Sequence, residues 1–390
     1  MEKREVIIFS GALFDSALWT NRQQIAVRLA ERGWKVLYVE PRLFWVRMLL
    51  GNFPGKNGRW RWFLRSLFPW QAQKNLFVIS QINAIPWSRE NGWVSWLNHF
   101  LNRPIVLLYA FLRGFRDPSI LIYDTEAAQY LKDFPYSRVV YDCVDDHGAQ
   151  EGVNRNSDRV KEEEEMIAVR ADAVSTTTQI LYDRFIKLNP NTVLNPNAAD
   201  VSKFIEHGSE DPTDVKEISH PRIGTVGALD DYKINSKLLI EVAKEKSDWQ
   251  FVLVGPQDYA TKKDTDGGIN ELKKLQNVHF LGAKISDDVP AYVHSFDVAI
   301  IPYRESNYNN ASFPLKFWEF MASGKPVVAS GLPELAKYKE MISLVSSPSE
   351  FIEGVEKGLK DSLDKKKIRV AEAMNHDWGA RVDIIENLLG

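Results

Sequence analysis

Residues 301–330 read IPYRESNYNNASFPLKFWEFMASGKPVVAS, and this stretch decides the fold class. It opens on the end of an apolar strand, continues as a polar loop rich in Ser and Asn, and enters a helix behind Pro314. The helix ends at Gly324, and a second apolar strand begins at Pro326. Two buried strands joined by a helix predict a strand-loop-helix-strand unit of a parallel sheet, and therefore an α/β protein.

The start of this helix is also a predicted ligand site. Free backbone N–H groups at a helix N-terminus can hold a phosphate. Glu319 lies about one turn into the helix, where its carboxylate can turn back toward the same opening. There it can accept hydrogen bonds from the hydroxyl groups of a sugar.

The segment LKFWEFMASGKPVVAS resembles the donor-site signature of retaining glycosyltransferases with the GT-B fold, of the family 4 type. The resemblance implies two Rossmann-like parallel-sheet domains that face a central cleft, with a C-terminal helix that crosses back to the N-terminal domain. In this family two glutamates eight positions apart hold the donor. Glu319 matches the second glutamate, which holds the ribose of the nucleotide, and Ala311 stands in place of the first.

The resemblance places further donor contacts along the second half of the chain. Lys233 follows the predicted strand Arg222–Val226 and matches a family lysine that binds the diphosphate, with an ordinary surface lysine as the alternative. Strand ends at Gly255 and Gly282 would form the base pocket, and polar groups beside Ala311 would contact the sugar. The predicted donor-binding residues are Gly11, Gly227, Lys233, Gly255, Gly282, Asn309, Asn310, Ser312, Leu315, Lys316 and Glu319.

Length and composition describe a two-domain globular protein. The chain has 390 residues, of which 44% are hydrophobic and 26% charged. A single cysteine, Cys143, excludes an intramolecular disulfide and indicates a reducing compartment. The N-terminus runs directly into a strand, and no apolar run reaches about 18 residues, so we expect neither a signal peptide nor a membrane span.

The predicted domain division follows a repeated pattern of strands and helices. Residues 1–205 form an N-terminal Rossmann-like acceptor domain, residues 206–375 the donor domain, and residues 376–390 a helix that returns to the first domain. The polar stretch from His207 to His220 is the predicted linker.

Two loops of the first domain carry candidate chemistry. Gly11 follows the strand Glu5–Phe9, where the family has a loop that approaches the donor phosphates; a plain turn glycine is the alternative. Asp145, Asp146 and His147 follow the strand Arg138–Tyr141, where the family often has a His-Asp pair. Such a group would receive the proton of the acceptor or orient its hydroxyl group, unless the loop is simply a solvated acidic turn or a helix cap.

Residues 41–116 form a basic, tryptophan-rich predicted insert. They contain eleven Lys and Arg, one carboxylate and seven of the twelve tryptophans of the chain. Cationic segments with Trp, Phe and Leu bind anionic membranes, although a packed insert with a basic rim, or single-stranded nucleic acid, would use similar residues. We expect the membrane surface, without nucleic acid, and assign the contact to Arg59, Trp60, Arg61, Trp62, Arg65 and Trp70.

Metal ligands are not expected. The triplet 264–266 is the one Asp-x-Asp candidate and falls in a polar loop, and no Cys or His cluster has ligand spacing. We therefore expect a cytoplasmic, membrane-peripheral glycosyltransferase that needs no metal or cofactor beyond its nucleotide-sugar co-substrate. Its acceptor would be lipid-linked or a surface polysaccharide. The alternatives are a soluble small-acceptor transferase, a nucleotide-sugar epimerase, and a domain that binds nucleotide or glycan without turnover.

Overall fold

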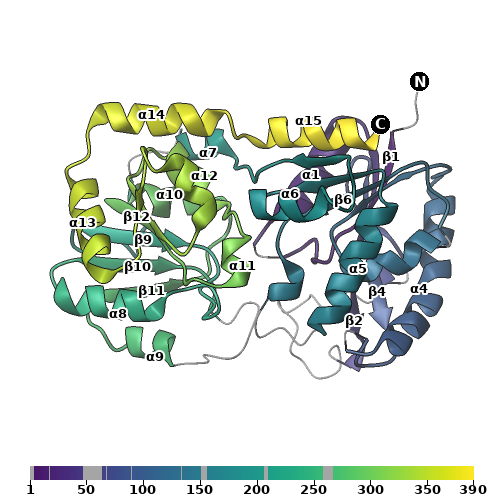
Figure 1. Ribbon diagram of the computed structural model, residues 1–390, viewed down its shortest axis with the longest axis horizontal. Coiled ribbons are helices and arrows are strands. Elements are labelled where there is room, and N and C mark those ends of the chain that lie inside the picture. Colours follow the sequence, from purple (N-terminus) through teal and green to yellow (C-terminus); the bar gives the residue numbers. More distant parts are fainter. Residues whose placement is uncertain are drawn as a thin grey trace. The chain divides into compact units, whose positions relative to one another are not determined.

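The computed structural model describes residues 4–16, 18–46, 64–66, 68–88, 90–132, 134–150, 156–205, 210–257 and 267–390. The chain folds into two compact units, each built on its own sheet with flanking helices (Figure 1). The first unit comprises Met1–Gly148, Asn154–Asn195 and Val382–Gly390, and the second comprises Ala149–Val153 and Pro196–Arg381.

The first unit contains a sheet in the order β3-β4-β2-β1-β5-β6-β7-β8. Neighbouring strands are parallel except for β3 and β4, which run antiparallel. The order reverses between β1 and β5, so the carboxyl ends of these two strands form a switch point where ligands bind in open α/β sheets. The strands are β1 (Glu5–Phe9), β2 (Lys35–Phe44), β3 (Trp70–Gln73), β4 (Leu76–Asn83), β5 (Ser119–Ile122), β6 (Val139–Cys143), β7 (Ala173–Thr176) and β8 (Thr192–Leu194).

Helices connect these strands. Thr20 and Gln23 form a capping box at the start of the first helix, α1. The last nine residues of the chain, from the end of α15 (Trp378–Leu389), also pack in this unit. The other helices are α1 (Asn21–Glu31), α4 (Gly92–Leu112), η1 (Thr125–Lys132), η2 (His147–Ala149), α5 (Ser157–Arg170) and α6 (Gln179–Phe185).

The described part of residues 41–116 belongs to the sheet and does not form a separate insert. Strand β2 continues to Phe44, and β4 pairs with it in parallel. Helix α4 then packs against β4 and η1. The high content of Trp and Arg obscures the pattern of two ordinary strands, β3 and β4, which lie at one end of the sheet.

The second unit contains a wholly parallel sheet in the order β11-β10-β9-β12-β13-β14. Its strands are β9 (Arg222–Val226), β10 (Gln250–Val254), β11 (Val278–Gly282), β12 (Val298–Pro302), β13 (Val327–Ser330) and β14 (Ser343–Leu344). Its helices are α7 (Val201–Ile205), α8 (Ser236–Glu245), α9 (Gly268–Leu272), α10 (Val289–His294), α11 (Asn307–Asn310), α12 (Lys316–Ala322), η3 (Pro333–Tyr338), α13 (Pro348–Leu359) and α14 (Leu363–Met374).

The stretch 301–330 has the predicted arrangement. Strand β12 pairs in parallel with β13, and α11 and α12 lie between them in the chain. Helix α12 ends before Gly324, which has a φ of +70°. Trp318 is fully buried, and its ring stacks on His376 at a centroid distance of 3.7 Å. The apolar face of α12 is therefore fixed in the core of the second unit.

The described part of the predicted linker packs within the second unit. Val215 is completely buried, and Ile218 joins the same hydrophobic core. Asp211 forms an ion pair with Arg222 at 2.6 Å. Two apolar residues in an otherwise polar segment are enough to hold it against the domain. Across the described residues, no helix is both long and apolar enough to cross a bilayer.

Candidate functional site

Glycines hold together the carboxyl ends of three strands in the second unit. The N–H of Gly227 donates to the carbonyl of Val254, and the N–H of Gly255 donates to the carbonyl of Gly282, both at 2.9 Å. Gly227 and Gly255 have φ values of +108° and +149°. A Cβ atom on Gly255 would lie 1.8 Å from the carbonyl oxygen of Gly227. Only glycine fits at position 255, because the backbone turn at Gly227 packs directly against it and leaves no room for a side chain.

Lys316 lies beside this glycine turn. Its side chain is buried, and its Nζ atom lies 3.2 Å from the position that a Cβ atom on Gly227 would occupy. It also lies 5.4 Å from the centre of the Tyr303 ring. Nζ has no hydrogen-bond acceptor among the described residues. A buried ammonium group without an acceptor is costly, and a bound anion would satisfy it.

Glu319 lies one turn after Lys316 on α12, and the spacing of three residues places both on the same side of the helix. Glu319 is half-buried, and its carboxylate makes no hydrogen bond or ion pair to a described residue. Burial raises the pKa of Glu319 to about 7, with Lys316 lowering it and Asp200 raising it. This side of α12 thus carries a cation and an acceptor, both without hydrogen-bond partners among the described residues.

The predicted polar contacts around Ala311 also make hydrogen bonds within the second unit. Asn309 is fully buried, and its Nδ2 atom donates to the carbonyl oxygens of Arg304, at 2.8 Å, and Lys233, at 3.2 Å. The hydroxyl group of Ser312 donates to the carbonyl of Tyr308 at 2.8 Å. Asn309 therefore ties the Lys233 loop to the loop after β12. Asn310 and Leu315 are partly exposed beside them.

Lys233 lies over two tyrosine rings. Its Nζ atom is 5.4 Å from the ring centre of Tyr232 and 5.6 Å from that of Tyr308. The N–H of Arg304 donates to the Lys233 carbonyl at 2.9 Å, which joins the loop to the end of β12. The structure thus places Lys233 in the loop that follows Asp230 and Asp231, both of which are buried.

In the first unit, Gly11 has a φ of +65°, and a Cβ atom on it would lie 3.2 Å from the Cβ of Asp124. The loops after β1 and β5 are therefore in contact, as expected at the switch point. The three predicted catalytic residues follow β6. Asp146 lies 3.7 Å from Arg184, His147 is buried in η2, and the carbonyl of Asp145 accepts from Cys143.

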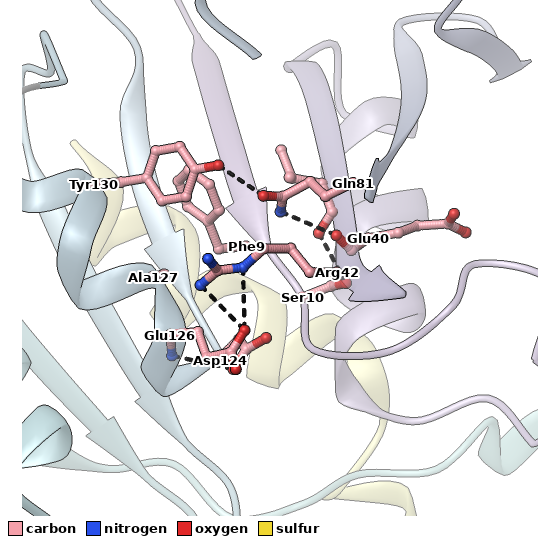
Figure 2. A pocket seen from close by; sticks show the side chains of 10 residues that line it. Phe9, Ser10, Glu40, Arg42, Gln81, Asp124, Glu126, Ala127 and Tyr130 are labelled. Atoms are coloured by element: carbon pink, nitrogen blue, oxygen red, sulfur yellow. Dashed lines mark hydrogen bonds and ion pairs between the residues drawn. The ribbon is translucent and has the colours of Figure 1, made fainter. Parts of the chain in front are cut away.

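A pocket at the same switch point contains residues that the sequence analysis did not select (Figure 2). Buried Arg42 donates from Nε to Glu126 at 3.1 Å and from Nη1 to the carbonyl of Ser95 at 2.8 Å. The second carboxylate oxygen of Glu126 is buried and has no described partner. The pocket is lined by Phe9, Ser10, Val39, Glu40, Arg42, Gln81, Asp124, Glu126, Ala127 and Tyr130.

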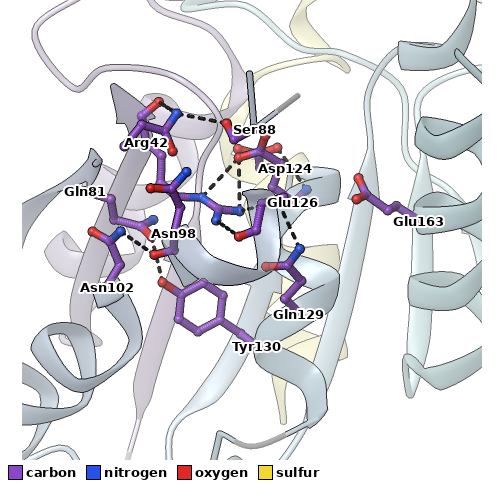
Figure 3. Close-up of polar contacts among 12 residues, drawn as sticks. Arg42, Gln81, Ser88, Asn98, Asn102, Asp124, Glu126, Gln129, Tyr130 and Glu163 are labelled. Atoms are coloured by element: carbon purple, nitrogen blue, oxygen red, sulfur yellow. Dashed lines mark hydrogen bonds and ion pairs between the residues drawn. The ribbon is translucent and has the colours of Figure 1, made fainter. Parts of the chain in front are cut away.

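A network of polar contacts orders the pocket wall (Figure 3). The hydroxyl group of Tyr130 donates to Gln81 at 2.6 Å, and Gln81 donates to the carbonyl of Glu40 at 3.1 Å. Burial raises the pKa of Glu40, while hydrogen bonds from Ser80 and the Phe14 N–H oppose the rise. The position of these groups at the ends of β2, β4 and β5 was the available signal. The sequence does not reveal it, because no strand is predicted over residues 76–83.

Of the predicted membrane residues, Arg65 and Trp70 lie in the described ranges. Arg65 is buried, forms an ion pair with Asp15 at 2.6 Å, and lies 4.3 Å over the ring of Trp70. Trp70 in turn packs edge-on against Phe14. Because these contacts hold the guanidinium group inside the unit, Arg65 is not available to bind lipid headgroups in this conformation. Residues 59–62 lie outside the described ranges, as does the triplet 264–266.

Comparison with known proteins gives one family and one curated relative. Residues 220–361 match the family described as "Glycosyl transferases group 1". The chain is 31% identical over 264 residues to a Bacillus subtilis (strain 168) protein that bears the provisional name of teichuronic acid biosynthesis glycosyltransferase TuaH. That match covers 63% of this chain and 65% of the length of the relative.

Solved structures share the fold over nearly the whole chain. Sucrose-phosphate synthase from Thermosynechococcus elongatus superposes with a TM-score of 0.71 at 16% identity, covering 99% of this chain and 98% of that one. Anabaena HepE, solved with UDP and glucose, superposes with a TM-score of 0.66 at 15% identity, covering 100% of this chain and 99% of that one. WaaG, a glycosyltransferase of lipopolysaccharide biosynthesis, superposes with a TM-score of 0.63 at 12% identity, covering 99% of each chain. The two parallel-sheet units are those of the GT-B fold, as the sequence predicted.

Proposed function

We infer that this chain, whose residues 220–361 carry the domain of the group 1 glycosyl transferases, is itself a glycosyltransferase. It moves a sugar from a nucleotide-diphosphate sugar to a lipid-linked or surface-polysaccharide acceptor at the cytoplasmic face of the membrane. The polysaccharide acceptor is supported by the name of the Bacillus relative. The HepE structure with UDP makes uracil the first base to test.

One observation carries the donor assignment: the buried ammonium group of Lys316 lies beside the Gly227 turn without an acceptor. A diphosphate is an anion that suits this position. On the same side of α12, the Glu319 carboxylate can accept hydrogen bonds from the ribose hydroxyl groups. The base is proposed to bind at the strand ends of Gly227, Gly255 and Gly282 on the strength of the family resemblance.

The reaction is proposed from the donor residues of the second unit and from the family resemblance. The bond between the anomeric carbon and the diphosphate oxygen breaks, and Lys316 stabilises the charge that develops on the departing diphosphate. The acceptor hydroxyl oxygen forms the new bond and loses its proton to a group after β6, for which Asp145, Asp146 and His147 are the candidates. Retention of configuration is proposed from the family resemblance. Lys316 supplies positive charge of the kind that a metal ion supplies at other diphosphates, so we propose a reaction without a metal.

The first experiment is a thermal-shift and calorimetric screen against UDP, GDP, ADP, dTDP and their sugar conjugates. A ligand that binds only the folded protein raises its apparent melting temperature. We expect one nucleotide to do so in the wild type and not in Glu319→Ala, with the free variant still folded. Equal stabilisation of the wild type and the variant would refute the donor site.

A second candidate function is binding without turnover, and Ala311 favours it. This alanine is buried where the family has its first glutamate. Release of free nucleoside diphosphate from the identified donor, measured with a crude lipid extract as the acceptor source, distinguishes the two. Turnover that is lost in Lys316→Met supports the transferase, and tight donor binding with no diphosphate release supports the binding domain.

A further inference from the structure

Helix α4 of the first unit has its polarity reversed relative to an ordinary surface helix. A helix at the surface of a globular protein normally buries an apolar stripe and exposes polar residues. In α4 the buried face is largely polar, and the exposed face is apolar. Eight large apolar side chains of the helix are more than one-third exposed: Trp93, Trp96, Phe100, Leu101, Ile105, Leu108, Phe111 and Leu112.

Two asparagines fasten the buried face. The Oδ1 atom of Asn98 accepts from the N–H groups of Ala84 and Ile85, and its Nδ2 atom donates to the carbonyl of Ile85 at 2.9 Å. Asn102 bonds the N–H and the carbonyl of Ile82 at 2.9 and 2.7 Å. Both side chains lie in one cluster with Gln81 and Tyr130 (Figure 3). These bonds set the rotation of the helix, so the apolar face cannot turn inward without breaking them.

The apolar face is continuous along the helix. Its members recur every three or four residues from Trp93 to Leu112, which is the period of one helical face. The rings of Trp96 and Phe100 stack on each other at 6.0 Å on the outside of the unit. Phe111 is 77% exposed and Trp93 66%. Contiguous exposed apolar surface of this extent marks an interaction site.

We propose that α4 docks the protein on an anionic lipid surface, with its axis in the plane of the headgroups. The composition of the face favours lipid over a protein partner, because tryptophan with Phe and Leu is typical of helices at the membrane interface. Charge favours it as well. From Gly92 to Arg116 the chain carries Arg103, Arg113 and Arg116 and no carboxylate, which complements anionic headgroups.

This inference deepens the proposed function, because a lipid surface would bring a lipid-linked acceptor within reach. It places the proposed membrane contact on α4, in addition to the residues 59–62 that lie outside the described ranges. The docking helix extends over 21 residues, about 31 Å at 1.5 Å per residue, and lies on the first unit. The donor residues lie on the second unit, so lipid binding and donor binding can be measured separately.

The test is sedimentation of the full chain with vesicles of mixed phosphatidylglycerol and phosphatidylcholine, and with vesicles of phosphatidylcholine alone. We expect binding to the mixed vesicles and at least tenfold weaker binding to the neutral ones. The variant Phe100→Ser/Leu108→Ser/Phe111→Ser should lose at least tenfold in vesicle affinity. The matched control is Ile285→Ser/Leu363→Ser/Met374→Ser, which removes three comparably exposed apolar side chains from the second unit and should bind as the wild type does.

Three results would overturn the proposal. The first is no vesicle binding by the wild type, and the second is sedimentation of the α4 variant with vesicles as efficiently as the wild type. The third is a lipid-free dimer that light scattering shows to become monomeric in the α4 variant, since a second copy would then cover the face. Nucleotide-induced thermal stabilisation should be the same in the wild type and the α4 variant. Its absence in both would count against the donor site and leave the docking result standing.

Discussion

At the scale of single residues, Lys316 is placed for binding at the expense of stability. The lysine side chain is buried beside the glycine turn, and its Nζ atom finds no acceptor among the described residues. Lys325 makes a useful contrast in the same unit. Its ammonium group donates to the carbonyls of His294 and Phe296. The two lysines differ in whether the protein itself satisfies the buried charge.

We therefore expect Lys316→Met to stabilise the free protein, by about 1 kcal/mol or more, because it removes an unpaired buried charge. The same substitution should abolish stabilisation by the donor nucleotide. Thermal unfolding with and without the nucleotide measures both effects. Lys325→Met is the control: it should destabilise the free protein, because it leaves two carbonyl groups without their donor. If Lys316→Met behaves like Lys325→Met and still responds to nucleotide, Lys316 is a structural lysine.

Glu319 predicts a pH dependence of donor binding. Burial raises its pKa to about 7 in the folded protein, against 4.5 for an ordinary glutamate. The folded chain therefore keeps this proton to higher pH than the unfolded chain. The contribution of this group to stability falls as pH rises from about 4.5 to 7. The ionised form accepts ribose hydroxyl groups better, so nucleotide affinity should rise between about pH 6 and pH 8.

Calorimetric titrations of the identified nucleotide across this range test the prediction. Glu319→Gln, which cannot ionise, should bind more weakly and give a flatter profile. A wild-type profile that matches that of Glu319→Gln would show that the pH dependence comes from another group.

At the scale of single elements, α12 and α4 have the same helical periodicity but bury opposite kinds of face. Helix α12 turns its aromatic residues into the core and places Lys316 beside the Gly227 turn, with Glu319 one turn further along the helix. Helix α4 turns Asn98 and Asn102 inward and its aromatic residues outward. The period of 3.6 residues predicts a face in each case. Which face is buried depends on the partner that the fold supplies.

Asn98→Leu tests whether polar contacts hold α4 in place. The substitution leaves the N–H groups of Ala84 and Ile85 without their acceptor, so we expect a loss of about 2–4 kcal/mol in the free energy of unfolding. Trp96→Ala, on the opposite face, should change it by less than about 0.5 kcal/mol. Urea unfolding followed by circular dichroism measures both. The reverse ranking would mean that the apolar face is the one that stabilises the isolated chain.

For the whole molecule, the last nine residues complete the first unit. Val382, Ile385 and Leu389 are buried in it, and Trp34 donates from Nε1 to Glu386 at 3.0 Å. Glu386 also forms an ion pair with Arg32 at 2.8 Å. The folded state of a unit that begins at the N-terminus thus depends on the C-terminal end of the chain.

Deletion of residues 382–390 should therefore destabilise the first unit by more than about 3 kcal/mol, because three buried side chains are removed. We expect limited proteolysis to cut first within residues 4–195, while nucleotide binding in the second unit persists. The control is Leu363→Ser, an exposed change near the same end of the chain, which should leave the digestion pattern unaltered. Cleavage that begins in the second unit would contradict the prediction.

Local patterns in the sequence determined the fold class and the position of helix α12. Continuous apolar runs predicted the parallel strands, and the segment from Leu315 to Ser330 located α12, its end at Gly324 and the next strand. These features depend on residues that are neighbours in the chain, so periodicity and turn chemistry are sufficient to predict them. The predicted site residues and domain bounds beyond these elements stay predictions.

Only the tertiary structure decided which residues meet and which faces remain uncovered. The pocket joins Arg42, Gln81 and Glu126, which lie on elements far apart in the sequence and meet only because β4 pairs beside β2. Arg65 became an internal ion-pair partner of Asp15, although its neighbours suggested a membrane contact. The outward direction of the α4 aromatics follows from hydrogen bonds to the backbone at residues 82–85. Long-range strand pairing and hydrogen bonding of this kind leave no local pattern, because each contact depends on where the fold places a distant segment.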